Sequence, residues 1–227
     1  NVLSSYKFTA GEESNYTVTT ADGQLTMTNA SAAITITAAS QSKKYDGNAL
    51  TNSGVTVTSG SLMTGDVLVA EATGSATNVA DTEEGNNPIA EGYKIMHGEE
   101  EVTANYAITA VAGKLTVEPA AVTVTAKSEK FTYDGNAHSN AGYDVAGLVG
   151  SDAITAVVEG SITFPSESPV DNVVKSHEFT TGTPGNYEVS YVDGELTMTN
   201  AEVAITITAA DDEWTYDGTA HRNTEVT

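Results

Sequence analysis

Four histidines are the first candidates for acid–base or metal chemistry: His97, His138, His177 and His221. His138 and His221 each follow a Tyr-Asp-Gly-x-Ala stretch, but Leu50 stands at this position in a third copy of the stretch. A position that accepts leucine is a packing or surface position. His177-Glu178 begins like the zinc-protease motif His-Glu-x-x-His, but Thr181 replaces the second histidine and the neighbourhood is typical of a strand, not a helix.

Other signatures of catalysis are missing from the sequence. It has no Gly-x-Ser-x-Gly nucleophile elbow, no phosphate-binding loop and no Gly-x-Gly-x-x-Gly fingerprint. The sequence therefore predicts that the chain is not an enzyme and has no catalytic, cofactor-binding or metal-binding residues.

Calcium binding and a covalent cross-link are two further chemistries to weigh. The stretch Asp81-Thr82-Glu83-Glu84-Gly85-Asn86-Asn87 is the densest group of oxygen ligands, but it lacks the spacing of an EF-hand, so calcium stays a minor alternative. A Lys–Asn cross-link needs a buried lysine beside an asparagine and an acidic catalyst, and no lysine is kept through the repeats. Lys44 and Lys130 precede their Tyr-Asp-Gly triplets, whereas the third copy has no such lysine, so no cross-link is predicted.

Large aromatic side chains offer a different chemistry, because they can stack on the faces of sugar rings. Four of them are interpreted as unpaired across the repeats, and they are the candidates for carbohydrate binding: Trp214, Tyr143, Tyr191 and Phe164.

Composition excludes several partners. The 227 residues include 9 basic and 31 acidic side chains, for a net charge of −22. This sign opposes nucleic acid and anionic membrane surfaces, which both bind through Lys and Arg. No apolar run is long enough for a membrane span, so no membrane insertion is predicted. Without cysteine, the chain has no disulfide and no thiolate chemistry.

Internal repetition is the strongest signal in the sequence. Tyr-Asp-Gly begins at Tyr45, Tyr133 and Tyr216, which are 88 and 83 residues apart. An alternating run such as Ile34-Thr35-Ile36-Thr37 precedes each triplet, and each copy also contains Asn-Tyr followed by Gly-x-Leu-Thr. Shifting the sequence by 171 residues places 1–56 on 172–227 with 31 identities and no gap.

Two kinds of repeat therefore alternate along the chain. The predicted division is the last third of one repeat, a complete longer repeat, a complete shorter repeat and the first third of another: residues 1–29, 30–117, 118–200 and 201–227.

The elements that must position these residues are predicted to be short β-strands. The Ile-Thr-Ile-Thr and Val-Thr-Val-Thr runs alternate with period two and use β-branched residues, and no stretch has a helical apolar stripe. Asp22-Gly23 and Asp193-Gly194 predict tight hairpin turns with positive φ, and Tyr-Asp-Gly predicts a turn in which Asp bonds to nearby backbone.

The connection between the two complete repeats is short. Only Glu118-Pro119-Ala120-Ala121 separates Val117 from Val122. The first and last strands of a repeat should then point the same way, and the domains should follow one another end to end as a rod. An immunoglobulin-like sandwich is favoured, with a β-grasp-like unit as the alternative.

The order of these motifs resembles the MBG and YDG-type tandem repeats of large bacterial surface proteins. The fullest version runs from Gly65-Asp66 through Thr73-Gly74-Ser75 and Asn105-Tyr106 to Gly113-Lys114-Leu115-Thr116. The resemblance implies an extracellular segment at the bacterial cell surface or cell wall that serves adhesion or acts as a stalk, and it implies no enzymatic activity.

Three functions remain in consideration. The favoured one is a structural and adhesive repeat module whose partner is a host or matrix protein or a glycan. The second is a carbohydrate- or ligand-binding β module that uses the aromatic candidates. The third is head-to-tail self-association into a fibre through the incomplete terminal repeats, which would leave unpaired strand edges.

Overall fold

A computed structural model describes residues 1–26, 28 and 31–226 of the chain, which fold as an all-β protein, as predicted. It divides into two compact units. The first comprises Asn1–Lys44 and Asn48–Glu118, and the second Tyr45–Gly47 and Pro119–Thr227. The only helices among the described residues are single 3-10 turns: η1 Glu13–Asn15, η2 Val79–Asp81, η3 Thr103–Asn105, η4 Pro165–Glu167 and η5 Pro184–Asn186.

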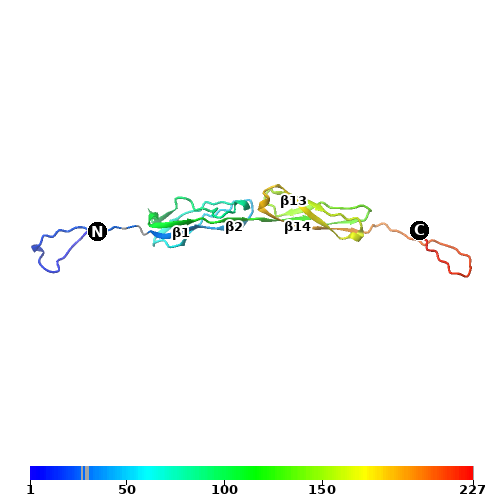
Figure 1. Cartoon of the computed structure of the whole chain (residues 1–227), viewed down its shortest axis with the longest axis horizontal. Coiled ribbons are helices and arrows are strands. Elements are labelled where there is room, and N and C mark those ends of the chain that lie inside the picture. Colours follow the sequence, from blue (N-terminus) through cyan, green and yellow to red (C-terminus); the bar gives the residue numbers. More distant parts are fainter. Residues whose placement is uncertain (27, 29–30, 227) are drawn as a thin grey trace. The chain divides into compact units, whose positions relative to one another are not determined.

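The first unit is built from short strands in three small sheets (Figure 1). Their bounds are β1 Ala32–Ala38, β2 Gln41–Lys44, β3 Val55–Ser59, β4 Asp66–Val69, β5 Lys94–His97, β6 Glu100–Glu101, β7 Tyr106–Val111 and β8 Leu115–Glu118. The sheet orders are β3-β1-β7, β2-β8 and β4-β5-β6.

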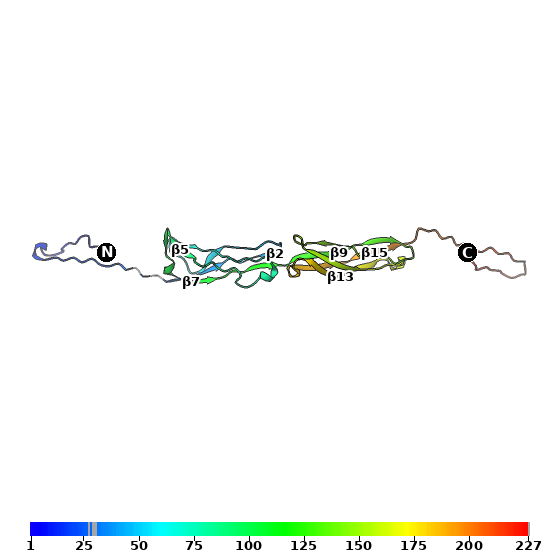
Figure 2. The same cartoon turned by 90° about the horizontal axis from the view of Figure 1, so that it is seen from above.

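The second unit repeats this plan with longer strands (Figure 2). Its strands are β9 Ala120–Ala126, β10 Glu129–Thr132, β11 Tyr143–Ala146, β12 Ala153–Glu159, β13 Val170–Thr181, β14 Tyr187–Val192 and β15 Gly194–Thr199. The sheet orders are β11-β9-β14 and β10-β15-β13-β12.

The alternating runs form the central strands and bury their apolar positions, as predicted. Ile34 and Ile36 of β1 are fully buried, and Val122 and Val124 of β9 occupy the same positions in the second unit. The intervening threonines lie on the other face of the strand, because side chains alternate along a pleated strand. Thr37, for example, shares a 2.7 Å hydrogen bond with Thr58 of β3.

In both units, the first strands pair in parallel with the last ones. β1 pairs with β7 and β2 with β8, while β9 pairs with β14 and β10 with β15. The chain therefore enters a unit beside one end of its last strands and leaves it at the other end. This direction agrees with the requirement that the short connection imposed. The central strand also pairs antiparallel on its other side, with β3 in one unit and β11 in the other.

The predicted Asp-Gly hairpins are wrong. β14 and β15 do not pair with each other, because β14 joins β9 and β15 joins β10 and β13. Gly194 does not have a positive φ. It is required by space instead: a Cβ at Gly194 would lie 2.6 Å from the carbonyl oxygen of Lys127, and one at Gly113 would lie 2.2 Å from that of Ala39.

The terminal segments contain no strand among their described residues. Residues 204–209 repeat residues 33–38 of β1, yet Ile205 and Ile207 are 85% and 73% exposed. The four-part division into repeats stays a prediction, and its boundary between residues 29 and 30 lies outside the described residues. Within the described ranges, no helix is long and apolar enough to cross a membrane.

Candidate functional site

The repeated Asn-Tyr landmark positions a tyrosine that bonds to a distant aspartate. Tyr106 opens β7, is almost completely buried and donates its hydroxyl to the carboxylate of Asp66. The backbone N–H of Met63 donates to the same hydroxyl at 2.9 Å. In the second unit, Tyr187 donates to Asp152 at 2.5 Å and accepts from the N–H of Val149 at 3.2 Å. The two pairs tie the start of β4 to β7 in the first unit, and the residue before β12 to β14 in the second.

Burial and these hydrogen bonds shift the titration of both partners. Burial, followed by the bond to Asp152, raises the pKa of Tyr187 to about 12. The same causes raise the pKa of Tyr106. The Tyr106 hydroxyl, and then the His97 ring at 2.7 Å, hold the pKa of the Asp66 carboxyl below its usual value. A tyrosine held in its protonated form is a poor base at neutral pH, so this pair is suited to structure and not to catalysis.

A buried asparagine occupies the same repeat position in each unit. The Asn87 side chain donates to the carbonyls of Ala39 and Asn52 at 2.8 and 2.9 Å, and it accepts from the N–H of Gly74 at 2.9 Å. It thus joins three segments that are far apart in the sequence.

Asn172 makes the corresponding bonds in the second unit. Its amide donates to the carbonyls of Lys127 and Asn140 at 2.9 and 2.8 Å. Its Oδ1 is buried and has no hydrogen-bond partner among the described residues. Gly160 lies against this oxygen, since a Cβ at Gly160 would be 2.5 Å from it.

Tyr-Asp-Gly forms the predicted turn. Gly135 and Gly218 both have positive φ, at 88° and 83°. Asp134 accepts from the N–H of Asn136 at 2.9 Å, and Asp217 accepts from that of Thr219 at 2.9 Å. The bond from the Asn136 N–H, followed by those from the His138 and Asn136 side chains, lowers the pKa of the Asp134 carboxyl to about 2.

The histidine after this turn packs locally in two copies. His138 Nε2 lies 3.0 Å from Asp134, and its ring stacks on Phe131 with centroids 4.7 Å apart. His221 repeats the arrangement with Asp217 and Trp214, at 3.0 Å and 5.1 Å. Trp214 is therefore the counterpart of Phe131, which the 83-residue repeat spacing could have revealed.

The structure does not bring the four aromatic candidates together. Tyr143, in β11, packs against the core at the position that Val55 holds in the first unit. Phe164 is half exposed and lies 6.2 Å from the ring of Tyr133. Trp214 stacks on His221. Tyr191, in β14, is 41% exposed and contacts His177, the first residue of the incomplete His-Glu-x-x-His motif.

The oxygen-rich loop at 81–87 uses its ligands internally. The Asp81 carboxylate accepts from the N–H groups of Thr77 and Asn78 at 2.8 and 2.7 Å. Asn86 bonds to the backbone of Leu115 through both atoms of its amide. Across the described residues, no three His, Asp or Glu side chains are grouped so as to hold a metal ion.

The side-chain amides of Asn87 and Asn172 donate to backbone carbonyls. Lys94, Lys114 and Lys127 instead pair with the carboxylates of Glu101, Glu84 and Asp144. The arrangement gives no support to a Lys–Asn cross-link.

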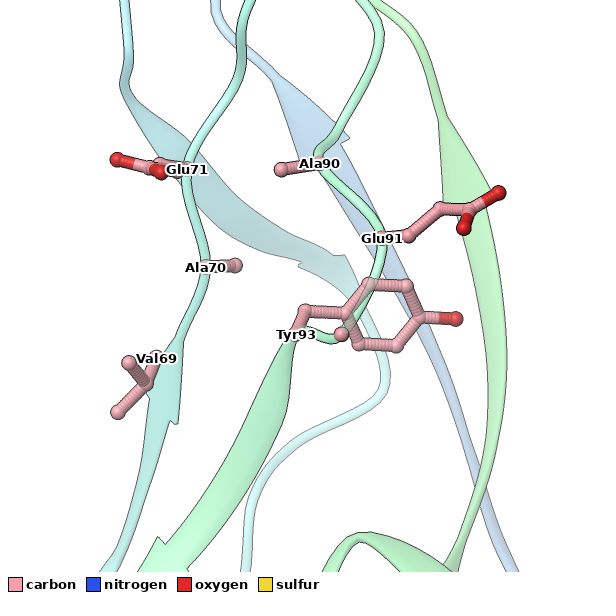
Figure 3. Close-up of a pocket in the computed structure, with 7 residues that line it drawn as sticks. Val69, Ala70, Glu71, Ala90, Glu91 and Tyr93 are labelled. Atoms are coloured by element: carbon pink, nitrogen blue, oxygen red, sulfur yellow. The ribbon is translucent and has the colours of Figure 1, made fainter.

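Two hollows of similar size lie at the same repeat position, one in each unit. The first, of about 240 Å³, opens between Val69–Glu71 and Ala90–Tyr93. Figure 3 shows the carboxylates of Glu71 and Glu91 pointing away from each other, so they do not converge on a ligand. The second, of about 280 Å³, lies between residues 155–157 and 176–178 beside an irregularity in the β12–β13 register.

The repeated tyrosines and asparagines thus define a class of small β-domain in which these side chains hold distant segments of the same unit together by hydrogen bonds. Residues 122–197, from β9 to β15, match the family model of the MBG domain (YGX type). This match confirms, over residues 122–197, the family resemblance predicted from the sequence. MBG domains are structural repeat modules of surface proteins. Comparisons with curated proteins and with solved structures gave no match.

Proposed function

We propose that this chain is a load-bearing stalk and adhesion segment of a bacterial surface protein. The observation that carries the proposal is the parallel pairing of first and last strands in both units. Six consecutive residue pairs join β1 to β7, and six join β9 to β14. Each of these ladders is continued by a second parallel one, β2–β8 or β10–β15.

Parallel pairing decides how a unit responds to tension. Force applied at the two ends of a unit pulls its first and last strands in opposite directions along their shared ladder. All hydrogen bonds of the ladder are then loaded together in shear. If the same strands were peeled apart from one end, the bonds would break one after another at a lower force. A domain with this topology is suited to hold an adhesive surface away from a cell under flow.

Roles of the repeated residues agree with this function. The Tyr106–Asp66 and Tyr187–Asp152 pairs, and the buried Asn87 and Asn172, tie loops to the loaded strands. None of them lines either hollow. The acidic side chains that outnumber the basic ones give the surface a negative charge, which keeps neighbouring molecules apart in solution.

Single-molecule force spectroscopy on the whole chain tests the proposal. Because the protein has no cysteine, engineered cysteines provide unique attachment points. Handles at the two ends of the chain load β9–β14 in shear, whereas A121C and E188C, at exposed paired residues, peel the same strands apart. Each unfolding event should extend the chain by up to about 300 Å for a unit of about 85 residues.

The expected result is a rupture force several-fold higher in shear than in peeling. Equal forces in the two geometries would contradict a load-bearing role for the parallel ladder. Cell-surface exposure is a separate part of the proposal, which antibody labelling of intact cells would test.

Head-to-tail association is a second candidate, and it rests on the exposed strand sequence near the C-terminus. Ile205 and Ile207 repeat Ile34 and Ile36, which are 3% and 0% exposed in the first unit. The complementary strands can come from further repeats or from a second copy of the chain. Sedimentation of this chain over a hundredfold dilution separates the two sources, since a monomer at every concentration would rule out self-association.

A further inference from the structure

We propose that the surface formed by Tyr191 and His177 in the second unit binds a neutral sugar ring. This inference rests on the proposed adhesive function and names a ligand class for it. Tyr191 projects from β14 and His177 from the neighbouring part of β13, with the Tyr191 hydroxyl 2.5 Å from His177 Nδ1. The two rings are 5.7 Å apart and meet at 75°, so they form two walls of a corner.

The corner lies next to the hollow of the second unit, because His177 contributes to both. The six residues that line the hollow are Thr155, Ala156, Val157, Ser176, His177 and Glu178. Its volume of about 280 Å³ lies just below the usual range of ligand pockets, so it suits a single ring better than an extended ligand. The irregular register of β12 and β13 opens the backbone here and makes the hollow part of the fold.

The corner has the mixed aromatic and polar character that carbohydrate recognition requires. A sugar ring presents C–H groups on one face, which pack on an aromatic ring, and hydroxyl groups around its edge. Where the Tyr191 hydroxyl donates to Nδ1, His177 Nε2 carries the ring proton and can donate to a sugar oxygen. Thr155, Ser176 and Glu178 are the other polar residues of the lining, and their side chains lie on the opposite face of β12 and β13 from Ala156 and His177, because side chains alternate along a strand. The net charge of −22 opposes acidic sugars, which leaves neutral ones.

Comparison of the repeats separates this feature from the needs of the fold. Ala110 holds the position of Tyr191 in the first unit, and Thr20 holds it in the partial N-terminal copy. His177 corresponds to Tyr93. The first unit thus keeps the hollow but lacks the second aromatic wall. Because the fold accommodates alanine at this register position, an exposed tyrosine there is an addition to the common plan.

Binding of the full chain to an array of neutral oligosaccharides tests the inference. The array should include glucose-, galactose-, mannose- and N-acetylglucosamine-terminated probes, with sialylated probes as the acidic comparison. We expect binding to a subset of the neutral probes. Y191A, which installs the residue of the first unit, should weaken it about tenfold or more. H177A, which removes the other ring of the corner, serves as a second variant, and E71A in the first unit's hollow is the matched control that should not change binding.

Three results would overturn the carbohydrate site: no neutral probe bound, binding only to acidic probes, or full binding by a correctly folded Y191A. Thermal unfolding of each variant checks the fold. If Y191A lowers the melting temperature and H177A leaves neutral binding intact, Tyr191 is a packing residue and the site is wrong. The force experiment is independent of sugars, so an intact shear response without sugar binding would leave the stalk function standing.

Discussion

Replacement of the buried asparagines should destabilise the two units to different, calculable extents. Asn87→Ala removes three hydrogen bonds and leaves the Ala39 and Asn52 carbonyls and the Gly74 N–H without their partner. Asn172→Ala removes two, because its Oδ1 already has no partner in the described structure. At about 1 kcal/mol for each bond, the expected losses are about 3 and about 2 kcal/mol. For a domain of this size, a loss of about 3 kcal/mol lowers the melting temperature by roughly 10–20 °C.

Urea unfolding combined with amide hydrogen exchange measures both effects. Exchange at β1 reports on the first unit and exchange at β9 on the second, so each variant should lower protection in its own unit only. Asn136→Ala is the control, because Asn136 is exposed and its bonds to Asp134 are local. It should change stability by less than about 0.5 kcal/mol.

A further variant distinguishes lost hydrogen bonds from lost volume. Asn87→Asp keeps the shape of the side chain but replaces the donating amide with a carboxyl group that faces two carbonyls. It should destabilise the first unit at least as much as Asn87→Ala. The reasoning fails if Asn87→Asp is neutral, or if both alanine variants cost less than about 0.5 kcal/mol.

Three other predictions follow from the geometry. In calorimetry, Gly194→Ala should destabilise the second unit more than Gly135→Ala. A Cβ at residue 194 would lie 2.6 Å from a backbone oxygen, whereas one at residue 135 meets nothing within 4 Å and is disfavoured only by the positive φ. The reverse order would contradict the argument from space. The pKa of Asp134 is lowered from 3.8 to about 2, so its carboxylate should contribute stability that is fully present above about pH 4 and is lost as the pH falls toward 2. In urea titrations, the difference in stability between the protein and Asp134→Asn should shrink over that interval. A constant difference would exclude this contribution. In an ultraviolet titration, Tyr187, whose pKa is about 12, should contribute to the last part of the tyrosine ionisation, and Tyr187→Phe should remove amplitude there. Loss of amplitude from the early part of the curve instead would show that the Tyr187–Asp152 bond is absent in solution.

The sequence alone determined the parts of this protein that depend on neighbouring residues. Period-two alternation in Ile34-Thr35-Ile36-Thr37 predicts a strand with one buried face, since side-chain direction alternates at every residue. Gly135 and Asp134 predict a turn, because a positive φ and an aspartate-to-backbone bond involve residues two apart. Short connections and parallel direction also follow from the sequence, because four residues cannot return the chain to the other end of a domain.

Only the tertiary structure decided the contacts between distant segments. Asp193-Gly194 has the composition of a hairpin turn, but the strands on either side of it pair with other strands. Glycine is required there because the backbone oxygen of Lys127, 67 residues earlier, leaves no space for a Cβ. Tyr106 and Asp66 are 40 residues apart, and Tyr191 meets His177 across 14 residues through strand packing. No local pattern encodes such pairs, because which side chains meet depends on how the strands are ordered in their sheets and on the register between them.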